Sequence, residues 1–186
     1  MKQGFSAHPL IQHPVRLLAR FASIPVLLLL TLLALLFPAL LFPALGMADL
    51  RPLDLYFCYS PEQAYANLDA LGAAGRSAYT RMLLLPDLVF PLVYATALSV
   101  ALMLALRGLL PLPRLSLCLF PFLIVVADWL ENLSLFIVTR EFPGRTDVIA
   151  GYAGCFTSLK WMLITLTVLI LLGSVAFRVA RHIRDR

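Results

Sequence analysis

Three acidic side chains and one lysine lie inside stretches of this sequence that are otherwise almost entirely apolar. The acids are Asp87, Asp128 and Glu131, and the base is Lys160. An ionisable group at the middle of a bilayer costs of order 2.5 kcal/mol or more, so such residues usually mark a functional site. A buried carboxyl group can act as a general acid or base, and a lysine can orient or neutralise an anionic group. We therefore take Asp128, Glu131 and Lys160 as candidate catalytic residues.

The spacing of these residues predicts that they share helix faces. Asp128, Glu131 and Asn132 are three and four residues apart, which puts them on one face of a helix. Thr157 and Lys160 share a face for the same reason. The pattern predicts polar groups from two helices that face each other.

A third helix brings a further acid to the same depth. Asp87 and Tyr94 lie two helical turns apart on one stripe, and Trp161 follows Lys160 directly. At 1.5 Å per residue, the acids and the lysine all lie roughly 13 to 18 Å from the outer ends of their helices. We expect one pocket in the outer half of the bilayer, with these ligand-binding residues: Asp87, Tyr94, Asn132, Thr157 and Trp161.

The composition indicates which elements carry these residues. Of the 186 residues, 61% are hydrophobic and 13% are charged, and the mean hydropathy is +0.91, which is outside the range of ordinary soluble domains. Four apolar segments are long enough to cross a core of about 30 Å. The sequence predicts a single all-α domain over residues 1–186, a polytopic four-transmembrane-helix bundle with helices at about 21–46, 77–106, 115–139 and 151–179.

The first outer loop, residues 47–76, carries the signal for a short additional helix. Ser60 can cap a helix with its hydroxyl, Pro61 suits the first helical position, and Glu62 places an acid in the first turn. We expect a short interfacial helix from there to about Leu71.

Basic residues indicate the orientation in the membrane. Of the 15 Lys and Arg residues, nine flank the helices on the inner side and five on the outer side if both termini are cytoplasmic, and Lys160 lies within a helix. The first apolar stretch is about twice as long as the core of a secretory signal, so we expect it to be retained as a helix. The prediction is an integral protein of the bacterial inner membrane or an equivalent cell membrane, with both termini cytoplasmic.

Several classes of site and partner are disfavoured. The net charge of +5 comes from residues at membrane edges rather than from one basic soluble face, so no nucleic-acid partner is expected. The histidines fall in the tails and no C-x-x-C occurs, which disfavours haem, His-ligated zinc and a thiol redox site. The Lys160 ammonium opposes a cation among the acids, so we expect no metal site and no cofactor. Whether Cys58 and Cys155 pair stays open. The small residues Ala150 and Gly154 suit helix packing within the chain or in a homo-oligomer.

The charge balance limits what the pocket can hold. Three acids against one lysine leave an excess of negative charge, which calls for a bound proton or a cationic group. We expect binding or processing of an apolar or amphipathic small molecule or lipid, including a cationic amphiphile. The alternatives are a structural protein whose charged network only stabilises the bundle, and a proton- or cation-coupled carrier.

Four segments resemble an uncharacterised family of four-helix membrane proteins over about Leu50 to Leu172. These segments are Tyr59–Tyr65, Pro86–Pro91, Asp128–Asn132 and Phe156–Trp161. That resemblance implies no established activity. More remotely, four helices with a long first outer loop look like the sterol-isomerase and sigma-2-receptor architecture, whose buried acids bind cationic amphiphiles. This second resemblance implies a sterol-like or amine-bearing ligand.

Overall fold

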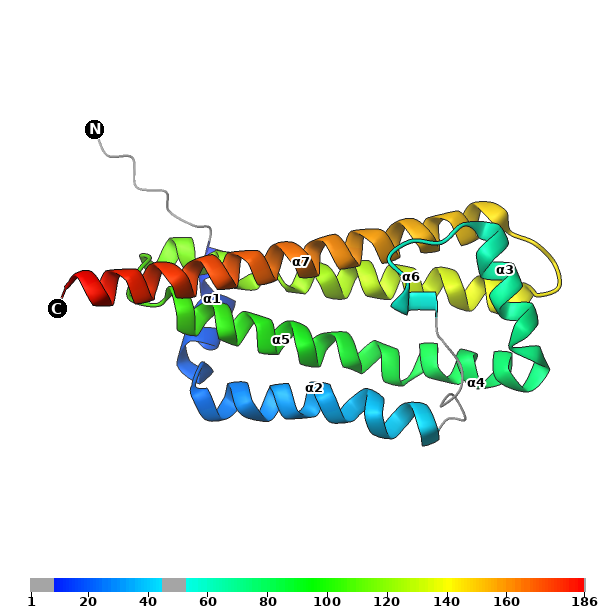
Figure 1. Cartoon of the computed structure of the whole chain (residues 1–186), viewed down its shortest axis with the longest axis horizontal. Helices are drawn as coiled ribbons and strands as arrows, with labels where there is room; N and C mark the ends of the chain where they lie inside the picture. Colours follow the sequence, from blue (N-terminus) through cyan, green and yellow to red (C-terminus); the bar gives the residue numbers. More distant parts are fainter. Residues whose placement is uncertain (1–8, 45–52, 186) are drawn as a thin grey trace.

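The computed structural model describes residues 9–44 and 53–185, and within them every regular element is a helix (Figure 1). Three segments are long and apolar enough to cross a membrane, and a bent helix pair makes a fourth if it is counted as one span. The prediction of an all-helical chain with several membrane-length apolar helices is confirmed. The elements in chain order are α1 (Pro9–Phe21), α2 (Ile24–Ala44), the 3₁₀ helix η1 (Leu53–Leu55), α3 (Pro61–Ala70), α4 (Gly72–Leu84), α5 (Pro86–Leu106), the 3₁₀ helix η2 (Leu112–Leu119), α6 (Phe122–Glu141) and α7 (Asp147–Arg184).

A separate amphipathic helix, α1, precedes the first apolar segment, and the hydropathy of the sequence did not predict it. α1 ends at Phe21, and the chain then bends by 95° into α2. Arg107 donates a hydrogen bond of 3.1 Å to the carbonyl of Ala22 at this bend. The helix predicted to begin at residue 21 therefore begins at Ile24, and its predicted end at 46 lies outside the described residues.

The second predicted helix, 77–106, is divided into α4 and α5. Leu85 separates them with φ of −122° and ψ of −69°, and Pro86 opens α5. Proline disfavours the helical conformation in the residue before it and has no N–H for the carbonyl four residues back. The break places Asp87 in the first turn of α5 instead of the middle of a longer helix.

The helices α6 and α7 pack along each other and form the largest helix contact in the described chain. The predicted start at 115 corresponds to η2, and α6 begins only at Phe122 after Pro121. α7 extends past both predicted ends, 151 and 179. Its 38 residues span about 57 Å, so it is longer than a hydrocarbon core of about 30 Å.

The short helix in the loop after α2 forms where its capping residues predict. The Ser60 side chain accepts from the Gln63 backbone N–H, and the Gln63 side chain accepts from the Ser60 backbone N–H. The Ser60 hydroxyl also donates to Glu62, which holds the pKa of that carboxyl below its ordinary value. Tyr65 of α3 accepts a hydrogen bond of 2.5 Å from the Thr146 N–H and so ties α3 to the start of α7.

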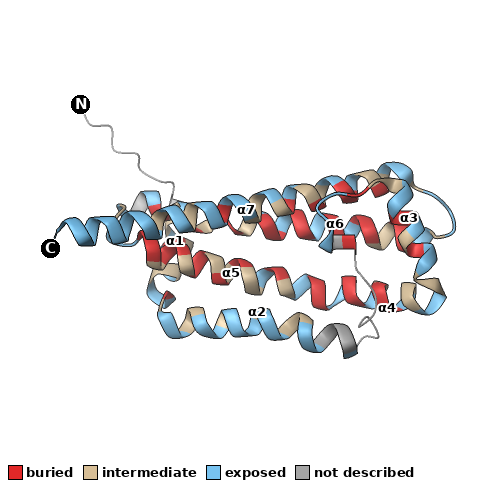
Figure 2. Ribbon diagram, in the orientation of Figure 1, coloured by how far each residue is buried: buried red, intermediate tan, exposed pale blue. Residues whose placement is uncertain are grey.

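Buried residues gather in two clusters, one toward each end of the bundle. One cluster is formed mainly by α3, α4, α6 and the start of α7, and the other by α1, α5 and η2. In Figure 2, α2 and the C-terminal part of α7 are mostly exposed. Exposed leucines on α2 suit contact with lipid. The polar residues of the predicted site lie in the length of the bundle that α5, α6 and α7 share.

Candidate functional site

The centre of the candidate site is a buried ion cluster between α6 and α7. The Lys160 ammonium lies 2.9 Å from Asp128 Oδ1 and 2.6 Å from Glu131 Oε2. All three side chains are buried. Because the two acids are three residues apart on one face of α6, both reach the same point on α7. The structure thus brings together the three residues that we predicted as catalytic.

Neighbouring polar groups complete this cluster. The Thr157 hydroxyl lies one turn before Lys160 and donates to Glu131 Oε1 at 2.6 Å. Asn132 Nδ2 lies 3.3 Å from Asp128 Oδ2. Glu131 is therefore contacted through both carboxylate oxygens and is fully enclosed, with 0% of its surface exposed.

Pro91 explains the position of Asn132. In a regular helix the carbonyl of Asp87 would accept from the N–H of residue 91, which proline lacks. Asn132 Nδ2 donates to this carbonyl instead, at 3.1 Å, and Trp129 Nε1 donates to the carbonyl of Leu88 at 3.1 Å. α6 thus supplies hydrogen-bond donors to the first turn of α5, which fixes Asp87 beside the ion cluster.

A cavity of about 420 Å³ opens beside the cluster. Its polar lining consists of Asp87, Asp128, Lys160, Tyr94 and Thr31. These groups come from α2, α5, α6 and α7. A ligand in the cavity would meet two carboxyl groups and one ammonium group at the polar end.

The remaining walls of the cavity are apolar. They are formed by Ala34, Leu55, Phe90, Ala97, Leu98, Trp161 and Ile164. Phe90 stacks on Phe37 of α2 with 5.4 Å between ring centroids, and it meets Tyr94 edge-on at 5.2 Å. This aromatic row joins α2 to α5 at the side of the cavity.

α2 forms the outermost wall of the cavity. It packs chiefly against α5, while α5 and α6 both pack against α7 (Figure 1). Thr31 and Ala34 line the cavity from α2, and Ile164 lines it from α7. Together with Asp87 and Asp128, these residues show that α2, α5, α6 and α7 all contribute to the lining.

The predicted site residues fall into two groups. Asp87, Tyr94, Asp128, Lys160 and Trp161 line the cavity. The other three, Glu131, Asn132 and Thr157, are buried behind this lining. Direct contact with a molecule in the cavity is thus available to Asp128 and Lys160, and Glu131 acts on such a molecule only through them.

Sequence reasoning missed the walls supplied by α2 and η1. Ala34 and Leu55 carry no polar atom in their side chains, and Thr31 stands alone in a leucine-rich run. Phe90 was open to identification, because it is four residues before Tyr94 on the same helix face. Nothing in the pattern of α2 indicates which of its faces meets α5.

In the described residues, no three or more His, Cys, Asp or Glu side chains are grouped as a metal site. Cys58, Cys118 and Cys155 are free thiols, and only Cys118 is buried. No protein-family model, curated protein or solved structure matches this chain.

Proposed function

We propose that this protein is an integral membrane protein that binds or processes an apolar or amphipathic small molecule or lipid in the cavity between α2, α5, α6 and α7. The observation that carries the proposal is a cavity of about 420 Å³ with apolar walls and a charged end formed by Asp87, Asp128 and Lys160. Small-molecule sites are typically concave, roughly 300 to 1,000 Å³ in volume and largely apolar, with a few convergent polar groups.

The charges favour a ligand whose polar end is cationic or donates hydrogen bonds. Two carboxyl groups line the cavity beside one ammonium group, and Glu131 adds a third acid behind them. A cation near these acids would reduce their mutual repulsion in a medium that screens charge poorly. The rings of Phe90, Tyr94 and Trp161 would add attraction through their faces.

The position of the cavity favours access from the lipid. A molecule dissolved in the bilayer could reach it between α2 and α7, with its apolar part along Ala34, Leu98 and Ile164. Its polar end would then lie at Asp128 and Lys160. Any reaction would use these two groups, with Asp128 exchanging a proton and Lys160 stabilising negative charge.

A structural role is the second candidate, and the contacts of Glu131 favour it. Its two carboxylate oxygens are taken by Lys160 and Thr157, so this part of the network is satisfied without a ligand. Polar contacts between membrane helices are worth only about 0.6 kcal/mol on average, which makes three acids an inefficient source of stability. The structural candidate explains Glu131 better than it explains Asp87 at the cavity wall.

Native mass spectrometry of the detergent-purified protein can separate these functions. The informative variant is Ala34→Phe, which fills the cavity from α2 and leaves the residues of the ion cluster unchanged. Ala39→Phe, on the exposed surface of the same helix, is the matched control. We expect a bound small molecule in the wild type and in Ala39→Phe, and its loss in Ala34→Phe.

A second pair of variants tests the role of charge. Asp87→Asn should reduce occupancy while the protein still folds, because Asp87 lines the cavity. Glu131→Gln should lower thermal stability more than occupancy, because Glu131 lies behind the lining. The structural candidate would be favoured if the wild type carries no bound molecule and if Asp87→Asn and Glu131→Gln differ from it only in stability.

A further inference from the structure

One end of the bundle carries almost unopposed positive charge. α1, the turn between α5 and η2, η2 itself and the last turns of α7 meet there, and we call it the basic end. In the described residues of these elements the only acid is Asp185. Their arginines are Arg16, Arg20, Arg107, Arg114, Arg178, Arg181 and Arg184.

In the described residues, the opposite end carries charges of both signs. Its acids are Asp54, Glu62, Asp69, Glu141 and Asp147, and its basic residues are Arg76, Arg81, Arg140 and Arg145. The asymmetry therefore distinguishes the two leaflets that the helix ends would meet. Anionic headgroups attract basic residues near a membrane surface, by about five-fold in affinity for each Lys or Arg.

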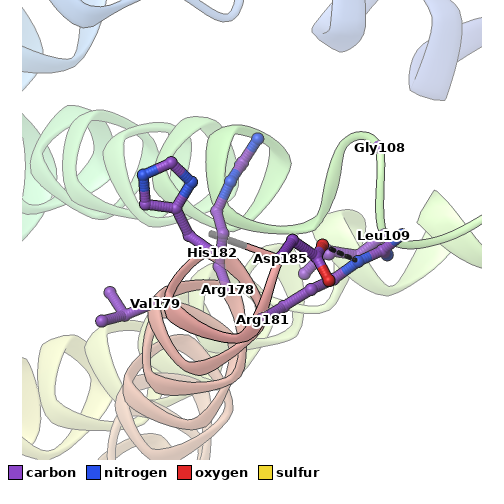
Figure 3. A pocket seen from close by; sticks show the side chains of 7 residues that line it. All are labelled: Gly108, Leu109, Arg178, Val179, Arg181, His182 and Asp185. Carbon is purple, nitrogen blue, oxygen red and sulfur yellow. Dashed lines mark ion pairs between the residues drawn. The ribbon is translucent and has the colours of Figure 1, made fainter.

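The basic end also contains a concave site. A surface cavity of about 470 Å³ lies between the C-terminal turns of α7 and the turn that follows α5. Figure 3 shows its lining, in which Arg178 and His182 lie on the side of α7 toward α5, while Arg181 and Asp185 lie toward Leu109. Gly108 completes the turn with φ of 81°, a left-handed conformation that glycine adopts without strain.

Arg178 is held in place within this cavity. Its Nη1 donates to the carbonyls of Leu104 and Ala105 at the end of α5. In the described part of the chain, Nε and Nη2 of Arg178 donate to no protein acceptor, so three of its five N–H donors are available. Arg181 is only loosely engaged, because its Nε lies 3.7 Å from Asp185 Oδ2.

We infer that this cavity binds the phosphate of an anionic phospholipid headgroup from the leaflet at the basic end. Arg178 is the fixed donor, and Arg181 turns from Asp185 to the phosphate. His182 is a further donor to the same group. This site shares no lining residue with the cavity between α2, α5, α6 and α7, so a negative result for one proposal does not contradict the other.

The test is native mass spectrometry of the full-length protein titrated with phosphatidylglycerol or with phosphatidylcholine of the same acyl chains. We expect the wild type to bind phosphatidylglycerol more tightly, and Arg178→Gln/Arg181→Gln to weaken that binding at least about five-fold. Arg81→Gln/Arg140→Gln removes the same charge from the opposite end, where both side chains are exposed, and should leave the binding unchanged. An equal loss in both double variants, or a loss in neither, would overturn the inference.

Two single variants and a competition experiment test the same site if the double variant does not fold. Arg181→Gln alone and Asp185→Asn remove only an exposed ion pair at the C-terminal end of α7, so both should fold even if Arg178 is needed to cap α5. Arg181→Gln should weaken phosphatidylglycerol binding, and Asp185→Asn should strengthen it by releasing Arg181. Excess inorganic phosphate should not displace the lipid. Full displacement would mean that the site recognises free phosphate and would overturn the assignment to a lipid.

Discussion

At the scale of single residues, Lys160 is the group on which the ion cluster depends. Its one ammonium group contacts both Asp128 and Glu131, at 2.9 and 2.6 Å, and so offsets part of their combined negative charge. Taking charges out of water is expensive, and mutual attraction offsets that cost only while both signs are present. The effect of a substitution therefore depends on whether it leaves a buried positive or negative charge without a partner.

Lys160→Met should be strongly destabilising. It leaves two buried carboxyl groups without their cation, and removal of one partner from a buried pair typically costs about 3 to 5 kcal/mol. The expected result is a clearly lower unfolding temperature in detergent. Combining it with Asp128→Asn and Glu131→Gln should recover part of the loss, because both carboxylates that Lys160 contacts are then removed as well. An unchanged unfolding temperature in Lys160→Met alone would contradict the ion cluster.

Asn132 should contribute to stability because Pro91 leaves the carbonyl of Asp87 without its helical N–H donor. Asn132→Leu leaves the carbonyl of Asp87 without a donor, at an expected cost of about 1 to 3 kcal/mol. In a Pro91→Ala background, the N–H at position 91 can bond this carbonyl, so the same change should cost less. A double-mutant cycle of unfolding temperatures measures the difference. Additive effects would show that Asn132 does not replace the missing N–H.

At the scale of elements, hydropathy predicted where apolar helices exist but not where they break. The break at Leu85 was open to prediction, because Pro86 disfavours helix in the residue before it. A proline at the start of a helix and one inside a kinked helix look alike in a sequence, so the pattern alone did not decide. α1 was missed because its mixture of polar and apolar residues does not stand out in a search for apolar runs.

The candidate site could be predicted only in part, because a sequence fixes spacing within a helix but not packing between helices. Spacing along one helix is fixed by geometry, which is why Asp128 and Glu131 were expected on one face. The rotation of α6 about its axis is set by packing against α5 and α7, and it decides that Asp128 lines the cavity whereas Glu131 lies behind it. That rotation depends on contacts between distant segments, which spacing does not encode.

The position of the segment before α3, at Phe57 to Tyr59, should depend on Gly154 of α7. A Cβ at Gly154 would overlap the carbonyl oxygen of Tyr59, and Ser158 donates to the carbonyl of Phe57 at 3.1 Å one turn later. Gly154→Ala should push this segment off α7 and destabilise the protein by about 1 to 3 kcal/mol. Gly173→Ala, in open space on the same helix, should leave the unfolding temperature unchanged or slightly higher. Equal effects of the two changes would contradict the close contact.

At the scale of the whole molecule, the number of spans depends on α1 and α2. α1 lies at the basic end, where Val15 is buried in the same cluster that Ile170 and Leu171 of α7 contact. If α2 crosses the membrane, α1 and the end of α7 lie on the same side. If only α5, α6 and α7 crossed, α1 would lie on the side opposite to the end of α7 and would lose this contact.

Single cysteines at three exposed positions should decide between these arrangements. In a background with Cys58, Cys118 and Cys155 replaced by serine, the variants are His13→Cys, Asp69→Cys and Arg184→Cys. With four spans and both ends cytoplasmic, a membrane-impermeant maleimide should label only Asp69→Cys in intact cells, and the other two after permeabilisation. Joint labelling of His13→Cys and Asp69→Cys would indicate three spans, because α2 would then not separate them. Labelling of His13→Cys and Arg184→Cys without Asp69→Cys would keep four spans and reverse the orientation.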